Sequence, residues 1–560
     1  MNLLQLILEL YWTDVYKTGH KFMLPPGSTL MYSNFTPRSG KWSNCPNNGK
    51  IVSFGQQMLV RKMNADWKAN FFDRPVEEIY QFGEDMTEML MLKQPFDVSH
   101  FVALHKLGYL PIEIKAVEEG NLIPYKIPLF DIVNTETLSG DIFDWMVNYL
   151  ETILSAESWQ APTSATLAYS FRKLGHEWIM RTDPENMWFL DYQFHDFSMR
   201  GMPGKSAIIN SGLGFSTCSR GSDTLPVIPA ARIFYNEKKV CIGSVLASEH
   251  AIMCTITGFF LQQKDGTWDK IGELEIETFR YLLKKFPSGI LSLVSDTWDL
   301  WRVIVEYCRI LKDEILARDG KLVIRPDSGT PEDIICGLSS EKYYQIDGQY
   351  WKAEDVTELE SMPVQYSIAP GAKPLNPAAI KGVIELLYEV FGGDKSSTGY
   401  IRLNPKIGAI YGDSITFARA KTIFIRLAAK GFASTNIVLG IGSYSLQGVT
   451  RDVHGFAQKA TYVEINGQGI EIFKDPITDD GGKKSARGLI IVFKDANGEY
   501  QIKDRCTWEE VRSTRNELKT IYKNGEFFNE TTLTDIRARL HATLEKEFET
   551  VTSAPGVVTL

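Results

Sequence analysis

Two charged side chains, Arg325 and Asp327, stand directly after the apolar run Leu322–Ile324 and just before Gly329. The run predicts a buried strand, because two of its three residues are β-branched. A strand that ends in polar groups delivers them to the mouth of an α/β sheet or barrel. There a guanidinium can grip a phosphate bidentately, and a carboxylate can hold hydrated Mg²⁺ or a sugar hydroxyl. A capped turn with a surface ion pair explains the same residues equally well, so both interpretations stay open.

A second group of chemically capable side chains falls at His195, Asp196, Phe197 and Arg200. It is a candidate site, and a structural His–Asp pair beside a core phenylalanine is the equal alternative. Further along the chain, His250 opens a predicted helix. A lone histidine is more often structural than catalytic, so His250 by itself indicates little.

The elements that must position these groups are strands followed by helices, a pattern that recurs through the second half of the chain. Such alternation implies a parallel sheet or barrel. Several strands that end in polar groups imply one shared site at the carboxyl edge, where glycines let backbone N–H groups close on a phosphate. The strands and the polar residues after them are Gly289–Val294 with Ser295 and a helix from Asp299, Ile407–Ile410 with Gly412 and Asp413, and Asn436–Leu439 with Gly442 and Ser443.

The first part of the chain has a different pattern. Residues 51–110 are predicted to be mostly helical, and residues 110–117 alternate like a half-exposed strand. Tyr16 is either a core aromatic or a stacking platform, with the core favoured. A polar stretch with several aromatics, residues 333–374, interrupts the later alternation; Asp347-Gly348 predicts a hairpin turn within it. Residues 505–548 are expected to form exposed helices and a tail.

Bulk properties exclude several classes. A chain of 560 residues with 44% hydrophobic and 23% charged residues is typical of a globular protein with two or more domains. The formal charge of -9 argues against a general nucleic-acid binder. A local basic pocket remains possible, with a solvated face as the alternative; its members would be Arg451, Lys459, Lys474, Lys483, Lys484 and Arg487.

Cysteine usage and hydropathy predict the compartment. The seven cysteines are scattered and none forms a CxxC pair, which fits reduced thiols in a cytoplasm and gives no zinc signal. The run Leu3–Leu10 is too short and too poor in Lys and Arg for a signal peptide. No segment approaches the length of a membrane span.

Taken together, the motifs resemble those of the nicotinamide phosphoribosyltransferases, within the type II phosphoribosyltransferases that include the nicotinate enzymes. The resemblance extends from Thr13 to about Gly488. The number of matching motifs and their order along the chain make the resemblance specific. They are Thr13–Lys17, His195–Phe197 with Arg200-Gly201, Gly221–Thr224, Ala247–His250, Val294–Asp296, Ile324–Gly329, Tyr411–Asp413, Thr450–Asp452 and Phe473–Pro476.

The resemblance implies transfer of a 5-phosphoribosyl group from phosphoribosyl pyrophosphate to nicotinamide, with Mg²⁺ as cofactor and ATP as a coupling substrate. It implies an irregular parallel α/β barrel flanked by an α+β domain built from N- and C-terminal segments. The division would be residues 1–138, residues 139–445 with an insertion at about 334–374, and residues 446–560. It also implies a head-to-tail homodimer with shared active sites.

The resemblance also assigns roles to single residues. Phe197 would stack on one face of the pyridine ring, and Tyr16 of the partner subunit would cover the other. Asp223 would accept the carboxamide N–H, and His250 would be the histidine that ATP phosphorylates. Arg200 and Arg325 would hold pyrophosphate, Asp327 would bind ribose hydroxyls or the Mg²⁺ shell, and Asp299 would help orient this part of the site. Gly412, Asp413 and Gly442 would line the phosphate pocket, reached from the partner by Arg451 and Lys459. Lys474 and Lys483 would add charge, and Arg38, Ser244, Ser295 and Ser443 complete the expected binding set.

The sequence departs from familiar animal members of this family in three places. The loop Gly440–Ser445 lacks their run of glycines, Ala457 replaces a serine, and the insertion after Asp333 is absent from them. Two rival functions remain: transfer to nicotinate, and a catalytically inactive relative that acts as a binding protein. The intact set Asp223, His250, Arg325 and Asp327 argues against the inactive relative.

Overall fold

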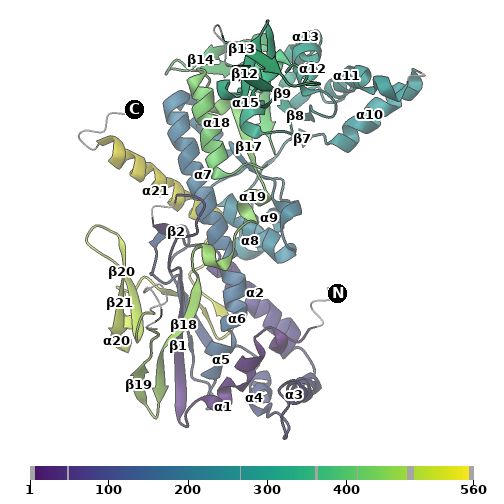
Figure 1. Ribbon diagram of the computed structural model, residues 1–560. Helices are drawn as coiled ribbons and strands as arrows, with labels where there is room; N and C mark the ends of the chain where they lie inside the picture. Colours follow the sequence, from purple (N-terminus) through teal and green to yellow (C-terminus); the bar gives the residue numbers. More distant parts are fainter. Residues whose placement is uncertain are drawn as a thin grey trace.

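The computed structural model describes residues 7–46, 49–264, 267–359, 364–412, 414–475, 478 and 485–553. Asp413 and Lys483, both expected in the site, lie outside the described residues. Two bodies share the chain (Figure 1): one holds a parallel sheet and the other an antiparallel sheet, and the long helix α7, Gln160–Thr182, runs between them.

Six strands form the parallel sheet, in the spatial order β6-β17-β16-β9-β8-β7. Every neighbouring pair is parallel. Two isolated parallel bridges, Asp196 with Ser222 and Gly221 with Gly243, continue the ring beyond β6 toward the segment that leads into β7. The sheet is therefore an irregular barrel, as predicted. Its strands are β6 Phe194–Asp196, β7 Leu246–Ala247, β8 Ser288–Val294, β9 Asp319–Arg325, β16 Ile407–Tyr411 and β17 Ile437–Ile441.

Strand β9 shows why this sequence suits a barrel. Leu322 and Ile324 are fully buried in the core cluster that the covering helices share, while Val323 and Arg325 alternate with them and are only partly buried. The helix predicted after Asp299 is present as short segments joined by a π-helical turn, Val303–Tyr307. The other helices of this body are α8 Lys205–Ser216, α9 Val227–Tyr235, α10 His250–Gln263, α11 Glu275–Lys285, α12 Leu300–Arg302, α13 Cys308–Ile310, α14 Lys312–Ala317, α15 Pro331–Cys336, α16 Pro377–Lys381, α17 Val383–Phe391, α18 Phe417–Ala429 and α19 Ser443–Leu446.

The second body is built from both ends of the chain, as predicted. Its seven-stranded sheet has the order β19-β18-β1-β5-β3-β22-β23, and every neighbouring pair is antiparallel. Its strands are β1 Ser28–Thr36, β3 Ile112–Ala116, β5 Phe130–Asn134, β18 Ala457–Ile465, β19 Gln468–Glu471, β22 Lys519–Lys523 and β23 Glu526–Phe527. Its helices are α1 His20–Met23, α2 Gln56–Trp67, α3 Glu77–Met89, α4 Ser99–Leu107, α5 Trp145–Tyr149, α6 Glu151–Ser158 and α20 Trp508–Val511.

The expectation of exposed helices and a tail over residues 505–548 is only partly confirmed, because strands separate the two helices of this region. Residues 519–527 form strands β22 and β23 around the turn Asn524-Gly525, where both residues have positive φ, as a two-residue hairpin turn requires. The final helix, α21 Leu533–Ser553, is not a free tail. It buries Leu533, Ile536, Leu540 and Leu544 in the core cluster of the barrel.

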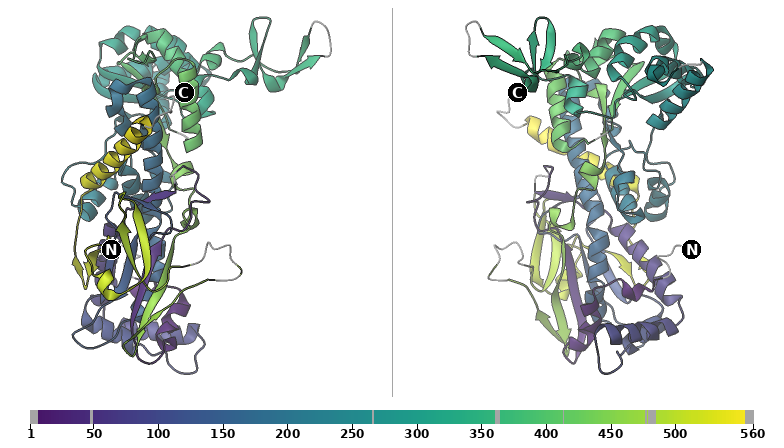
Figure 2. Two further views of the ribbon diagram at one scale, coloured as in Figure 1. Left: turned by 90° about the vertical axis from the view of Figure 1, so that its left-hand side faces the viewer. Right: turned by 45° about the vertical axis from the view of Figure 1, so that its right-hand side comes forward.

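The insertion is a projecting arm of two hairpins (Figure 2). The first pairs β10, Tyr343–Ile346, with β11, Gln349–Lys352, and the second pairs β12, Val356–Leu359, with β13, Gln365–Ile368. Asp347 and Gly348 make the predicted hairpin turn, with φ of 51° and 79°. The remaining small sheets pair β2 Lys50–Val52 with β4 Leu122–Pro124, β14 Gly393–Lys395 with β15 Ile401–Leu403, and β20 Leu489–Lys494 with β21 Tyr500–Cys506.

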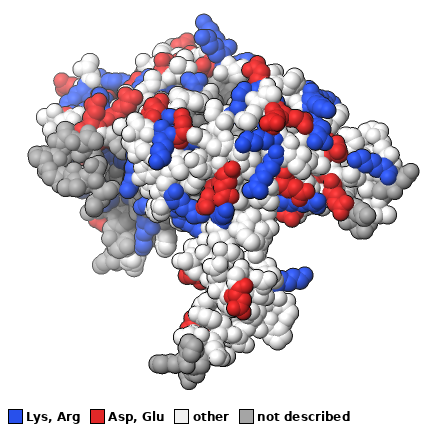
Figure 3. All heavy atoms as spheres, turned by 90° about the horizontal axis from the view of Figure 1, so that it is seen from above, with Lys and Arg blue, Asp and Glu red and all other residues white. Residues whose placement is uncertain are grey.

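The surface and the thiols agree with the bulk composition. Seen from above (Figure 3), Lys and Arg side chains are interspersed with Asp and Glu. All seven cysteines are free, and Cys254 is the one that is exposed. Among the helices of the described residues, none is both long and apolar enough to cross a bilayer.

Candidate functional site at the carboxyl edge of the barrel

The carboxyl ends of the parallel strands bring the predicted polar residues to one edge. Phe197 follows β6, Ser295 and Asp296 follow β8, and Arg325 ends β9. Gly412 follows β16, and Gly442 follows β17. Parallel strands end on the same side of a sheet, so these groups face one mouth of the barrel.

The Phe197 ring is seated on glycine backbone. A Cβ atom built at Gly440 would lie 2.4 Å from Cδ2 of Phe197 and 2.7 Å from Cα of Gly412, and one at Gly412 would lie 3.5 Å from the same ring. Only hydrogen fits at Gly440 without a shift, so glycine here permits the close approach. The imidazole of His195 packs on Phe197 with ring centroids 4.5 Å apart. The ring is therefore held as a partly buried platform.

Asp223 presents a fixed carboxylate close to that platform. Its Oδ1 accepts a hydrogen bond from Nε2 of His195 at 2.9 Å and another from the Ser244 hydroxyl. Burial by itself raises the pKa of Asp223, but the donors from His195 and Ser244 and the charge of Arg325 outweigh it, and the net pKa lies below its ordinary value. Asp223 is thus held ionised and nearly half exposed.

Arg325 is a cation with unused hydrogen-bonding capacity. Its Nε is buried and has no hydrogen-bond partner among the described residues. Burial lowers the pKa of the guanidinium, while Asp327, Asp223 and Asp296 oppose that effect. Arg200, exposed in the turn Met199–Gly201, is a second cation of the same neighbourhood. A buried guanidinium with a free donor suits an anionic ligand.

Asp296 organises the loop after β9. Its Oδ2 accepts hydrogen bonds from the Asp327 backbone N–H at 2.8 Å and from the Ser328 hydroxyl at 2.6 Å. The Asp327 carboxylate is thereby directed toward β16, and its Oδ1 lies 3.4 Å from the Cβ position of Gly412. The other oxygen of Asp296, Oδ1, lies 3.8 Å from Nε2 of His250.

His250 is accessible at the first residue of α10. Its side chain is 48% exposed, and Nδ1 lies 3.4 Å from the Thr297 hydroxyl. Asp299 caps α12, accepting from the N–H groups of Trp301 and Arg302. Behind these residues Glu275 is buried, and burial first, then Asp299 and Asp296, raise the pKa of its carboxyl to about 8.

The remaining predicted residues of this edge differ in how deeply they are buried. Ser295 is fully buried and its hydroxyl donates to the Leu293 carbonyl, so it supports the strand end from within. Ser443 packs against Gly201, where a Cβ would meet the Ser443 hydroxyl at 1.8 Å. Gly442 has open space on its Cβ side.

The structure does not bring the other predicted residues to this edge within one chain. Tyr16, Arg38, Arg451, Lys459 and Lys474 belong to the antiparallel body (Figure 1) or to the segments next to its strands. Tyr16 is 58% exposed, so the favoured interpretation as a core residue is wrong. The short 3-10 helix that carries Tyr16, Val15–Gly19, buries the neighbouring Lys17 and Thr18 and leaves the ring outside.

This second group is cationic and mostly solvent-facing. Lys459 and Lys17 share Glu151, with ion-pair distances of 3.1 and 3.0 Å. Arg38 is tied down, since its Nε donates to the Gly455 carbonyl at 2.6 Å. Arg451 and Lys474 are exposed.

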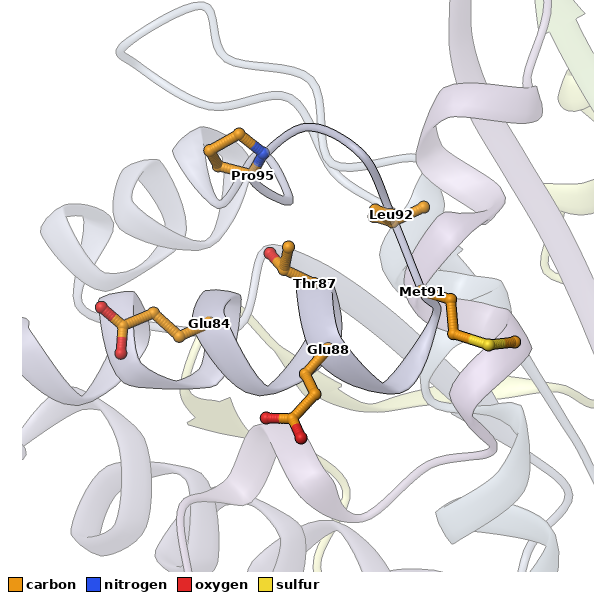
Figure 4. Close-up of a pocket in the computed structure, with 6 residues that line it drawn as sticks. All are labelled: Glu84, Thr87, Glu88, Met91, Leu92 and Pro95. Atoms are coloured by element: carbon orange, nitrogen blue, oxygen red, sulfur yellow. The ribbon is translucent and has the colours of Figure 1, made fainter.

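Sequence reasoning assigned no role to several residues that shape the edge. Asp296, His195 and Gly440 lay inside or beside the motifs, but their roles depend on contacts across strands that no spacing reveals. Glu275 carried no signal, because its burial depends on how α11 packs. The described residues also line a shallow hollow at the end of α3 (Figure 4), formed by Glu84, Thr87, Glu88, Met91, Leu92 and Pro95, which lies in the antiparallel body and away from the barrel edge.

Comparison with known proteins identifies relatives of the whole chain. Residues 192–526 match the Nicotinate phosphoribosyltransferase (NAPRTase) family. A protein of Acinetobacter baylyi named nicotinamide phosphoribosyltransferase is 38% identical, covering 95% of this chain and 97% of the relative. A protein of Mycoplasma pneumoniae with the same name is 30% identical, covering 86% and 96%. The crystal structure of human nicotinic acid phosphoribosyltransferase shares the fold, with a TM-score of 0.51, 14% identity and coverage of 95% and 94%.

Proposed function

Because the chain belongs to the nicotinate phosphoribosyltransferase family, we propose that it transfers the 5-phosphoribosyl group of phosphoribosyl pyrophosphate to nicotinamide, releasing nicotinamide mononucleotide and pyrophosphate. The enzyme is a nicotinamide phosphoribosyltransferase of NAD salvage, like the relatives that carry this name. The observation that carries the base assignment is the ionised Asp223 beside the Phe197 platform.

The chemistry needs charge neutralisation and positioning. The transition state of ribosyl transfer resembles an oxocarbenium ion leaving a pyrophosphate, and the pyridine nitrogen is already a nucleophile, so no general base is required. Arg325, with its free Nε, and Arg200 supply positive charge to the leaving group. Phe197 stacks on the base and Asp223 orients its carboxamide, which holds the ring nitrogen toward the ribose carbon.

The residues of the edge fit a magnesium ion bound largely through substrate. Mg²⁺ keeps several waters and uses one or two carboxylates plus substrate phosphates. The exposed Asp327 carboxylate, set by Asp296 through its backbone N–H, offers that kind of ligand. Among the described residues, no three His, Cys, Asp or Glu side chains gather into a metal cage. When bound, the ion would supply further charge neutralisation to the leaving group.

Asp223 also accounts for the choice of base. Its carboxylate accepts a hydrogen bond from the amide nitrogen of nicotinamide, whereas nicotinate brings a second negative charge. Two like charges about 4 Å apart repel by about 4 kcal/mol at an effective dielectric near 20. Selection by an unmatched polar group is stronger than selection by shape, so a single side chain can decide it.

The test is pyrophosphate release with nicotinamide, nicotinate and quinolinate, each with phosphoribosyl pyrophosphate. The wild type is expected to favour nicotinamide by several hundred-fold or more, since each 1.4 kcal/mol is about tenfold. Asp223→Asn should narrow or reverse that ratio. No pyrophosphate release with any base would contradict the proposal and favour an inactive binding relative.

His250 is proposed as the acceptor of a phosphoryl group from ATP. The support is its exposed imidazole at the mouth of the same edge, within 3.8 Å of Asp296, and its place in the motif Ala247–His250. A phosphorylated His250 would couple ATP hydrolysis to product formation without taking part in ribosyl transfer itself.

A homodimer with shared sites belongs to the same proposal. Its support is the division of the predicted residues into two groups that one chain keeps apart, one acidic and cationic at the barrel edge and one exposed on the antiparallel body. A head-to-tail pair would place each second group over the other subunit's edge. Sedimentation or light scattering that finds an active monomer would contradict it.

A further inference from the structure

We infer that His195 is a positioning residue that sets base choice by holding the Asp223 carboxylate in one orientation. The inference rests on the proposed function and extends it to a residue that the sequence left open between a site residue and a structural His–Asp pair. One imidazole touches both side chains that would hold the base: Nε2 lies 2.9 Å from Oδ1 of Asp223, and the ring packs on Phe197.

The two oxygens of Asp223 have unequal surroundings. Oδ1 receives both protein donors, His195 and Ser244. Among the described residues, no hydrogen bond to Oδ2 is made by the protein, so Oδ2 is available for a ligand N–H. The Asp223 backbone is also fixed, because its N–H donates to the Asp196 carbonyl at 3.0 Å. With both backbone and Oδ1 held, the free acceptor points in one direction.

The hydrogen bond defines what His195 must be. A carboxylate accepts only, so Nε2 carries the proton, and the imidazole serves as a donor in this contact. The Nδ1 edge of the ring lies against the backbone of Gly221, where an added Cβ would be 2.9 Å from Nδ1. The side chain of His195 is 9% exposed, so the donor itself is held in place by its surroundings. Without this donor, the Asp223 carboxylate would be free to rotate away from the base. It would then bind nicotinamide less well and repel nicotinate less strongly.

Two variants separate the donor from the packing. His195→Phe keeps a ring against Phe197 and removes the donor, while His195→Gln replaces the ring with a side chain that still carries an N–H donor. His195→Phe should lower the nicotinamide-to-nicotinate ratio of kcat/KM by roughly ten- to a hundredfold, as expected for loss of a hydrogen bond to a charged group. The change should fall mainly on KM for nicotinamide. His195→Gln should recover part of the ratio.

A double-variant cycle tests whether His195 acts through Asp223. In an Asp223→Asn background, His195→Phe should leave the base ratio unchanged, because the group that it positions no longer carries the charge. A full additional drop in that background, or an unchanged ratio in the single His195→Phe variant, would overturn the inference. Failure of the wild type to use nicotinamide would instead contradict the proposed function, so the two failures are distinguishable. Far-UV circular dichroism and Tm check that each variant is folded.

Discussion

The barrel edge and the exposed cations of the antiparallel body use opposite ways of presenting charge. At the edge, hydrogen bonds hold the acids in place: His195 and Ser244 donate to Asp223, and Asp296 accepts from the backbone N–H of Asp327. On the antiparallel body, Arg451 and Lys474 project into solvent. The acids of the first group are preorganised within one chain. In the second group, Lys459 and Arg38 have partners of their own, whereas Arg451 and Lys474 are exposed.

The contrast has a functional meaning. Preorganised groups are worth most where charge develops during reaction, because they need not reorganise at that moment. Long, exposed cations lose side-chain entropy when they engage a ligand, but they attract anions from a distance. We therefore expect the barrel edge to govern chemistry and base choice, and the second group to govern capture of phosphate.

The largest effect should come from removing Arg325, the partly buried cation of the barrel edge. Arg325→Ala should lower kcat/KM for phosphoribosyl pyrophosphate by about a hundredfold or more, in line with loss of one strong stabiliser of a developing anion. Steady-state pyrophosphate release measures it. Arg309→Ala, an exposed arginine on α13, is the matched control and should change little. Equal losses of kcat/KM in both variants would mean that Arg325 contributes no more to catalysis than an arginine outside the barrel edge.

Mixing two variants asks whether the two groups meet across subunits. Arg325→Ala disables the edge and Arg451→Ala disables the second group. If each site takes one group from each subunit, half of the randomly reassorted dimers are mixed and each has one intact site, which restores about a quarter of wild-type activity. The measurement is activity after co-refolding or co-expression. Activity no higher than the mean of the separate variants would show that both groups serve the same subunit.

A single methyl group should disturb the Phe197 platform. Gly440→Ala puts a Cβ 2.4 Å from the ring, so the ring must move, and KM for nicotinamide should rise about tenfold, the cost of roughly one aromatic contact and its alignment. Gly408→Ala on the adjacent strand is the control, since its Cβ would approach the flexible Lys321 side chain at 3.3 Å and meet Val323 only at an ordinary contact distance of 3.8 Å. A wild-type KM in Gly440→Ala would mean that the ring does not hold the base.

ATP stimulation should depend on His250 while transfer does not. His250→Ala should lose the proposed stimulation by ATP and keep slow product formation, because its imidazole lies 3.8 Å from Asp296, which holds the loop after β9. Initial rates with and without ATP measure it. Full stimulation in the variant would refute the assigned role.

The smallest effect on activity is expected from two buried acids, one from each body, which act on the pH dependence of stability. Burial raises the pKa of Glu275 from 4.5 to about 8 and that of Glu9 from 4.5 to about 7, with Asp299 and Asp66 as the next causes. A raised pKa means that the folded state keeps its proton after the unfolded chain has lost it. The stabilising contribution is complete below pH 4.5 and is lost as pH rises through the folded pKa.

Urea unfolding of the wild type and of Glu275→Gln or Glu9→Gln measures these contributions. The wild type should lose on the order of a few kcal/mol relative to Glu275→Gln between about pH 4.5 and 8, and relative to Glu9→Gln the loss should level off nearer pH 7. Parallel pH profiles of the wild type and Glu275→Gln would show that Glu275 ionises normally in the folded protein.

The sequence predicted local features and missed those that depend on distant contacts. The run Leu322–Ile324 and the turn Asp347-Gly348 were confirmed, because strand burial and positive φ are written in neighbouring residues. The same kind of signal, Asn524-Gly525, marks a hairpin turn in the C-terminal region, where helices were predicted. The exposure of Tyr16 and the burial of Glu275 are set by packing between segments far apart in the chain, and no local pattern contains them.

The candidate site divides in the same way. Arg325, Asp327, Phe197 and Asp223 were predicted because they follow strands or belong to motifs, and the structure brings them to one edge. The roles of His195 and Asp296 needed the identity of their hydrogen-bond partners, which only the parallel register supplies.

The seam of the barrel is its least continuous part. Between β6 and β7 the ring is carried by two single bridges, Asp196 with Ser222 and Gly221 with Gly243, whereas β8 and β9 pair over seven residues each. Backbone amides in a short ladder open at lower free energy than those of a long one. Amide hydrogen exchange should therefore be fastest around residues 221–224 and 243–247, next to Asp223 and Ser244, and slowest in β8 and β9. A base that contacts both sides of this seam would slow amide exchange there. Binding of the base could therefore be measured as protection of these amides from exchange.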